Sequence, residues 1–198
     1  MADFTVDRDD LSPLATALLG AAAGAFGVWA LDRLDWWMWR NEDPEATRRT
    51  TAVRPGGEPP AHVLATEAER AVGVEPTAAA HRLTGDVIHY MIGVAPAIGY
   101  ALYRDKLPGQ GAARGALYGL GLSLGEDELL NPLSGLAAKP QAYPWQAHAR
   151  GLLAHTLYGV ATEYALNLAE QALRDRDTGG ESATFKPRPD VHQQVQTA

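Results

Sequence analysis

The stretch Leu14–Leu31, LATALLGAAAGAFGVWAL, decides the fold because it contains no charged side chain. An uncharged run of this length reaches the roughly 18 residues that a helix needs to cross a bilayer. The aromatic cluster Trp36-Trp37-Met38-Trp39 follows it, as at a membrane interface. The run predicts a first membrane span over about residues 14–36, and an uncleaved signal anchor would show the same pattern. The acidic residues before it argue against a cleaved signal peptide.

Three further apolar segments predict spans over about residues 84–103, 112–130 and 148–173. Each is interrupted by polar residues or proline: His89 and Pro96 in the second span, the run Glu126-Asp127-Glu128 in the third, and His155 and Glu163 in the fourth. A water-soluble four-helix bundle is the alternative, since its helices also carry regular polar interruptions.

Two features favour the membrane over the soluble bundle. The polar side chains are too few to form a solvated face on any of the four segments. Small residues also recur at helix-packing spacing, in Gly20-x3-Gly24, Gly111-x3-Gly115-x3-Gly119 and Gly121-x3-Gly125. In a water-soluble helix each such glycine would cost about 1 kcal/mol relative to alanine.

The predicted fold is therefore all-α, a polytopic membrane protein with four transmembrane helices in an antiparallel bundle, over residues 14–173. Residues 1–13 form an N-terminal tail, and residues 174–198, which are polar, are predicted to be disordered. The Pro/Gly/Arg-rich stretch between Arg40 and Pro60 predicts a loop. An interfacial helix follows over about residues 61–74, and a short helix that caps the bundle would have the same pattern.

Composition excludes several classes of protein. The chain has 198 residues, a formal net charge of −7 and no cysteine. Without cysteine there is no disulfide scaffold, thiolate zinc site, iron–sulfur cluster or cysteine nucleophile. The acidic balance and the absence of a basic stripe argue against nucleic acid as a partner. The one Gly-x-Ser-x-Gly sequence, Gly121–Gly125, lies inside an apolar helical segment and not at a strand-to-helix turn, so serine hydrolysis has no support. No P-loop or dinucleotide fingerprint follows a predicted strand. The sequence names no catalytic residue, so an enzyme is not the leading interpretation.

Four antiparallel spans bring particular residues to the same side of the membrane. We name the side reached at the end of the first span face B, and the other side face A. The polar residues that border the spans gather on face B: Asp32, Arg33, Asp35, His81, Arg82, Asp86, His89, Glu126, Asp127, Glu128, His148 and Arg150, with His155 further along the fourth span. All five tryptophans fall there too.

Three consecutive acids at a helix C-terminus oppose the helix dipole and need compensation. An ion-pair network with Arg33, Arg82 and Arg150 is one answer. Convergence on a proton path or a divalent cation is the other, because charges near lipid usually mark sites. The metal hypothesis uses His89, Glu126, Glu128 and His148, a donor set that suits zinc, manganese or iron. Haem ligation by His89 and His155 is a minor alternative.

The second half of the chain carries an ordered set of motifs: Glu128, then Pro132-Leu133-Ser134-Gly135-Leu136, then Pro144-Trp145-Gln146-Ala147-His148, then Gly151, His155, Tyr158-Gly159 and Glu163. With the small-residue first span, this resembles the YagU-like family of uncharacterised bacterial inner-membrane proteins, over roughly residues 12–172. The resemblance implies a polytopic inner-membrane protein and a role in tolerance of acid conditions, with no established catalytic residues or cofactor. The chain departs from the family in being richer in Ala and Gly and in its longer charged tail.

The leading functional hypothesis is an integral membrane protein whose polar cluster on face B handles ions or protons. An accessory or assembly subunit that packs against partner membrane proteins, or against a second copy of itself, is the first alternative. A membrane metalloprotein with a His/Glu site is the second. Three cations in the short segment Arg104–Arg114 favour cytoplasmic termini and a periplasmic face B.

Overall fold

The computed structural model describes residues 11–181 and is all-helical over that range, as predicted, with no strand among these residues. The long helices are α1 (Pro13–Asn41), α4 (Ala78–Tyr103) and α7 (Trp145–Glu181). A fourth helical segment consists of α5 (Gly111–Leu122) and the π-helix η4 (Ser123–Leu130), which follow each other without a break. Short elements complete the chain: α2 (Pro44–Val53), η2 (Pro55–Gly57), α3 (Pro60–Val72), η3 (Arg104–Lys106), α6 (Asn131–Leu133) and η5 (Pro140–Ala142).

The helices begin where the sequence supplies a cap. The Ser12 side chain accepts a hydrogen bond from the Ala15 backbone N–H at 3.2 Å, and Pro13 takes the first position of α1. Thr77 caps α4 in the same way, through the N–H of Ala80. Proline suits the first turn of a helix because its missing N–H would have no partner there anyway. Helix α3 ends at Gly73, which adopts a left-handed conformation with φ of 70°, a common way for a helix to end.

The region between α1 and α3 corrects the sequence-based prediction of a loop. Asp43 accepts a hydrogen bond from the Glu45 N–H at 2.9 Å, and Pro44 starts α2. The prolines therefore mark helix starts rather than the turns that the composition indicates. The helix predicted over residues 61–74 corresponds to α3 at Pro60–Val72.

The chain ends lie partly outside the described range. Helix α7 continues to Glu181, past the predicted end of the fourth span at residue 173. Residues 1–10 and 182–198, which make up most of the two predicted tails, lie outside the described residues.

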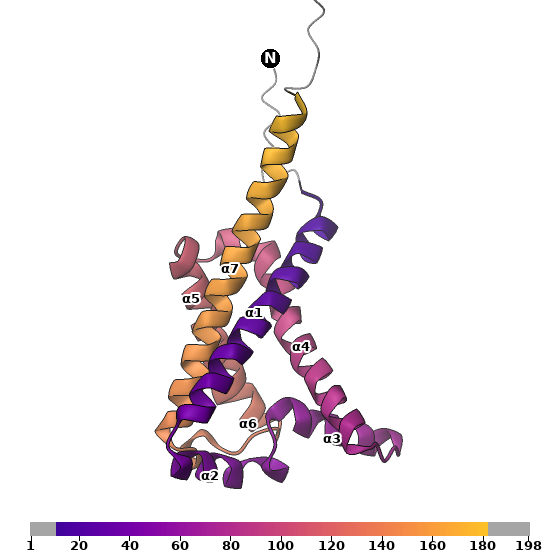
Figure 1. Ribbon diagram of the computed structural model, residues 1–198, viewed down its shortest axis with the longest axis vertical. Coiled ribbons are helices and arrows are strands. Elements are labelled where there is room, and N and C mark those ends of the chain that lie inside the picture. Colours follow the sequence, from indigo (N-terminus) through magenta and orange to yellow (C-terminus); the bar gives the residue numbers. More distant parts are fainter. Residues whose placement is uncertain (1–10, 182–198) are drawn as a thin grey trace, which may run out of the picture.

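Helix α1 packs against both α4 and α7, and α5 packs against α7 (Figure 1). Glycines permit these contacts. A Cβ on Gly24 would lie 2.5 Å from the Ala97 Cβ of α4, and one on Gly115 would lie 2.6 Å from the Gly159 carbonyl oxygen of α7. The buried core combines small side chains with a few large ones: Ala23, Val28, Ala97, Tyr100, Ala101, Tyr158 and Leu166. Gly20-x3-Gly24 thus lies at a helix contact, as do Gly115 and Gly119 of the predicted series, whereas a Cβ on Gly111, the first glycine of that series, would meet no atom within 4 Å.

The distribution of polarity is unusual. Large apolar side chains are exposed on every long helical segment, including Leu14, Leu18, Phe26, Leu83, Val87, Met91, Leu117, Leu124, Leu152, Leu153 and Leu168. Charged side chains are buried at the same time: Arg104, Arg150, Glu163 and Glu170. By length and composition alone, α1 is the one helix among the described residues that could cross a membrane.

Candidate functional site

The ends of the helices gather the polar residues predicted on face B. The C-terminal end of α1, helices α2 and α3, the N-terminal half of α4 and helix α6 lie at the same end of the molecule (Figure 1). Each histidine among the described residues meets a carboxylate there, and each pair joins two different elements. We name these the face B pairs: His62–Asp86, His81 with Glu58 and Glu69, His89–Asp32, His148–Glu128 and His155–Asp127.

One face B pair joins α4 to α1. The Nε2 atom of His89 lies 3.0 Å from Asp32 Oδ1, and both side chains are partly buried. Glu126 of η4 interacts electrostatically with His89, His155 and Asp127. The Glu126 carboxylate is therefore within electrostatic range of two histidines that come from different helices.

Two face B pairs join η4 to α7. The Nδ1 atom of His148 lies 2.5 Å from Glu128 Oε1, and Nδ1 of His155 lies 3.2 Å from Asp127 Oδ2. The second ring nitrogen of His148 faces the Pro140 carbonyl oxygen at 3.1 Å. Both ring nitrogens of His148 thus face hydrogen-bond acceptors.

The remaining face B pairs attach α3 to α4. His81 lies 2.8 Å from Glu69 and 3.1 Å from Glu58, again through both ring nitrogens. These hydrogen bonds, with Glu69 first and Glu58 second, raise the pKa of His81 above its ordinary value of 6.5. His62 lies 3.7 Å from Asp86 and covers Gly85, where any side chain would collide with its ring. Sequence reasoning did not single out His62; the helical pattern of α3 alone does not say which face meets α4.

Arg150 forms a separate cluster at the start of α7. Its Nε donates to Asp35 at 3.0 Å and its Nη1 donates to Glu42. The guanidinium lies 4.6 Å from the centroid of the Trp39 ring, and Arg54 lies 5.2 Å from the same ring. Burial and the neighbouring Arg150 charge lower the pKa of Arg54 from its ordinary value. This arrangement joins the end of α1 to α2 and α7.

The arginine network predicted to compensate the acids of η4 is therefore wrong for these residues. Asp127 and Glu128 are paired with histidines of α7, whereas Arg150 binds Asp35 and Glu42. Arg33 lies 5.9 Å from the Trp29 ring, and Arg82 is exposed. The reason is geometric: α7 places histidines opposite η4, and its one nearby arginine points to the end of α1.

The residues of the metal hypothesis are distributed between separate pairs. His89 binds Asp32, and His148 binds Glu128, while Glu126 interacts with His89 electrostatically and takes part in neither hydrogen bond. Within residues 11–175, no group of three or more His, Asp or Glu side chains is arranged to hold a metal ion. His155, the other residue of the haem alternative, faces Asp127 and the Gly151 carbonyl oxygen.

A second polar cluster lies toward face A, and sequence reasoning did not single it out as a site. The Glu163 carboxylate accepts from Tyr100 at 2.9 Å, from Arg104 at 2.8 Å and from Arg114 at 2.8 Å. Arg104 also binds Asn167 at 2.9 Å and Glu170 at 2.5 Å. Arg104 is 2% exposed and Glu163 is 1% exposed. The signal available in the sequence was the presence of two acids, Glu163 and Glu170, inside the fourth predicted span, together with the cations of the short segment Arg104–Arg114.

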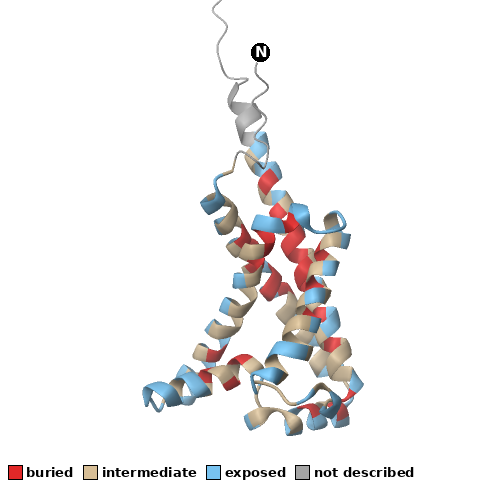
Figure 2. Cartoon of the chain, turned by 180° about the vertical axis from the view of Figure 1, so that it is seen from behind, coloured by how far each residue is buried: buried red, intermediate tan, exposed pale blue. Residues whose placement is uncertain are grey.

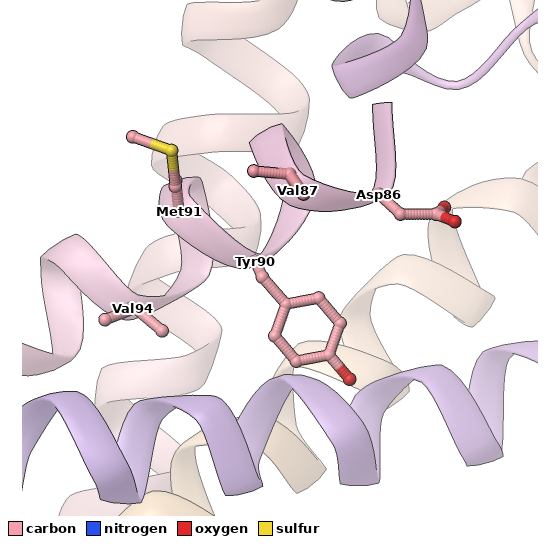
Figure 3. A pocket seen from close by; sticks show the side chains of 5 residues that line it. All are labelled: Asp86, Val87, Tyr90, Met91 and Val94. Atoms are coloured by element: carbon pink, nitrogen blue, oxygen red, sulfur yellow. The ribbon is translucent and has the colours of Figure 1, made fainter. Parts of the chain in front are cut away.

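The side of α4 near its N-terminus forms a shallow groove lined by Val87, Tyr90, Met91 and Val94, with Asp86 at its edge (Figure 3). The Tyr90 ring points toward α1, whereas Met91 points away from it. The surface of the groove is almost wholly apolar.

Searches of this chain against protein-family models, against curated proteins and against solved structures each find no match. Function must therefore be argued from the residues and their geometry.

Proposed function

We propose that this chain is a polytopic membrane protein that binds and releases protons at face B. Its four spans lie within α1, α4, α5 with η4, and α7, over about the residues predicted from the sequence, and it resides in the bacterial inner membrane with face B in the periplasm. The resemblance to the YagU-like family, with its implied link to acid tolerance, agrees with this proposal.

The distribution of polarity supports the membrane. Soluble monomers rarely expose a large continuous apolar surface. Here leucine, valine, methionine and phenylalanine side chains are exposed on all four segments, while two arginines and two glutamates are buried. In a bilayer the exposed apolar side chains face lipid, and charged residues turn inward and pair.

The observation that carries the proton function is that every histidine among the described residues bridges two elements to a carboxylate. Imidazole is the side chain whose charge changes nearest neutral pH, so such a pair gains or loses its ionic character there. Because each pair joins two elements, a change in the charge of the histidine changes how strongly those elements are held together. Toward face A, in contrast, Arg104 and Arg114 connect the helices by binding Glu163 of α7. Arginine side chains stay charged at all accessible pH values.

The first experiment tests the topology. The chain has no cysteine, so single cysteines report single positions. We expect Arg49→Cys and Gln141→Cys to react with a membrane-impermeant maleimide from the same side, and Gln110→Cys from the other. Labelling of Arg49→Cys and Gln141→Cys from opposite sides would overturn the four-span arrangement.

The second experiment tests proton binding. The purified protein in lipid nanodiscs is titrated between about pH 9 and pH 5, the range in which histidine charge changes. We expect the triple variant His89→Gln, His148→Gln, His155→Gln to take up fewer protons than the wild type. The matched control Arg48→Gln, Arg49→Gln removes two charges that do not titrate there and keeps the wild-type curve. A triple variant with the wild-type curve contradicts the proposal.

An accessory or assembly subunit is a second candidate, and one observation favours it. Gly121 and Gly125 form the third glycine pair predicted from the sequence, and a Cβ added to either would meet no atom within 4 Å, in contrast to Gly115 and Gly119. With Leu117 and Leu124 exposed beside them, these glycines offer a close-packing face to another membrane helix. A stoichiometric partner or second copy, cross-linked in native membranes from Leu124→Cys, would support it, and absence of any cross-linked species would contradict it.

A further inference from the structure

The two halves of α4 are packed very differently. In the C-terminal half, Ala97, Tyr100 and Ala101 are buried, and Ala97 and Ala101 fit against Gly24 and Gly20 of α1. In the N-terminal half, Leu83, Val87 and Met91 are exposed. Figure 2 shows the buried residues concentrated where the long helices cross, with few along the part of α4 that leads to α3.

Pro96 lies at the boundary between these halves. It stands inside α4, where proline removes one backbone hydrogen bond and its ring crowds the preceding turn. Proline is among the few identifiable causes of a helix bend. The residue is therefore positioned to allow the N-terminal half of α4 to change direction while the C-terminal half stays packed.

The N-terminal half carries α3 with it. His81 binds Glu69 of α3, and His62 of α3 lies against Gly85 and near Asp86. We name α3 together with residues 78–95 of α4 the arm.

The contacts of the arm with α1 and α7 lie mainly toward Pro96, where Gly93 and Val94 approach Gly24 of α1. Gly93 and Tyr90 lie near Val28, and the Tyr158 hydroxyl of α7 donates to the Gly93 carbonyl oxygen at 2.6 Å. His89–Asp32 comes next toward the free end of the arm. Between residues 78 and 88, all of them described, no hydrogen bond or ion pair joins α4 to α1.

We infer that the arm pivots at Pro96 and that the His89–Asp32 pair is a pH-dependent latch that holds it against α1. This inference deepens the proposed function and rests on it, since the latch is one of the face B pairs. The latch holds while His89 is protonated and Asp32 is ionised, and it releases when His89 loses its proton.

The surroundings of His89 determine the direction of the change. Asp32 faces it from α1, Asp86 and Tyr90 lie on α4 itself, and Glu126 approaches from η4. Arg33, beside Asp32 in sequence, is exposed and lies over Trp29. The charged neighbours that face the ring are thus acidic and stabilise imidazolium, so the arm is docked at acid to neutral pH and released at alkaline pH.

The test uses pairs of spin labels in the full chain in nanodiscs, with distances measured by electron paramagnetic resonance. The reporting pair is Leu83→Cys with Trp36→Cys, and the control pair is Leu14→Cys with Leu102→Cys near face A; all four side chains are exposed. Between about pH 6 and pH 9, the range around the ordinary histidine pKa, we expect the reporting pair to shift to longer and broader distances while the control pair is unchanged. A reporting pair that does not shift overturns the latch.

Variants separate the latch from general destabilisation. His89→Gln and Asp32→Asn are expected to give the released distribution at every pH, and His89→Arg, which keeps a permanent charge, the docked distribution at every pH. Pro96→Ala is expected to reduce the amplitude of the shift. If the nanodisc titration shows histidine-dependent proton uptake but the reporting pair does not move, the proton function stands and the pivot is wrong. If the distances shift in the wild type and the His89→Gln variant alike, another group drives the movement and His89 is not the latch.

Discussion

A Cβ atom on Gly119 would collide with the backbone carbonyl oxygen of His155. Helices α5 and α7 therefore meet backbone to backbone, and the contact is reciprocal, because a Cβ on Gly159 would collide with the carbonyl oxygen of Gly115. The same stretch of α7 presents His155 to Asp127. The close approach of α5 and α7 thus helps to bring His155 within reach of Asp127.

Gly119→Ala is expected to separate α5 from α7 and to lower the unfolding temperature measured in detergent, because the obstructing atom is backbone and cannot rotate away. The matched control is Gly121→Ala, two residues along, where a Cβ meets no atom within 4 Å. That change is expected to be neutral or stabilising by up to about 1 kcal/mol through helix propensity. Equal effects of the two substitutions would contradict the packing described for this pair of helices.

Glu163→Gln is expected to destabilise the fold strongly. It leaves Arg104 and Arg114 in the interior with one negative partner fewer, and breaking a buried ion pair by removing one member costs about 3–5 kcal/mol in soluble proteins. The measurement is the unfolding temperature or the denaturant midpoint in detergent. Glu67→Gln is the control, because the Arg70–Glu67 pair is exposed to solvent, and such pairs contribute about 0–1 kcal/mol. Similar losses of stability in Glu163→Gln and Glu67→Gln would show that the buried Glu163 contacts contribute no more than an exposed ion pair.

The attachment of α3 to α4 is expected to weaken as pH rises. Hydrogen bonds that the His81 ring donates to Glu69 and Glu58 raise the pKa of His81 in the folded chain. The stability that these contacts contribute is fully present below the unfolded pKa of about 6.5 and is lost as pH rises through the higher folded value. The difference in unfolding temperature between wild type and His81→Gln should be largest near pH 6 and should shrink at alkaline pH. A difference that grows with pH would contradict this assignment.

Trp39→Leu is expected to loosen α2 from the ends of α1 and α7. The ring lies near both the Arg54 and the Arg150 guanidinium groups, and each such contact contributes about 0.5–2 kcal/mol depending on burial. Limited trypsin digestion should cut faster after Arg48 and Arg49 in the variant. Trp37→Leu is the control, since Trp37 is exposed. An unchanged rate of cleavage in Trp39→Leu would show that Trp39 does not hold α2 in place.

The sequence predicted the helical class and several helix contacts correctly because those depend on local signals. Gly20 and Gly24 recur at one helical spacing, so this contact was visible without knowing the partner helix, whereas the caps at Ser12 and Thr77 were not identified from the sequence. Helix α2 was not predicted because proline is common both in turns and at the first position of a helix, so Pro44 alone does not distinguish the two. Only the capping contact of Asp43 distinguishes them.

The pairing of charges was harder to predict than their location. Arg150, His148 and His155 were expected on one face, but which acid each binds depends on helix rotation and on the path of η4. Glu163 and Arg104 are about sixty residues apart in the chain, and their contact depends on α4 and α7 converging toward face A. Periodicity within one helix carries no information on either point.

The π-helical form of η4 has a consequence for how the chain tolerates changes in length. A π-helix closes its hydrogen bonds one residue later than an α-helix, so it turns less per residue and accommodates extra residues within a continuous helix. In η4 the adjacent Asp127 and Glu128 both reach histidines of α7 that lie seven positions apart. Removing one residue from Ser123–Leu130 would tighten these turns and rotate the carboxylates out of phase with both histidines, without altering a single ionisable side chain. Spacing in this segment is thus as much a requirement as residue identity.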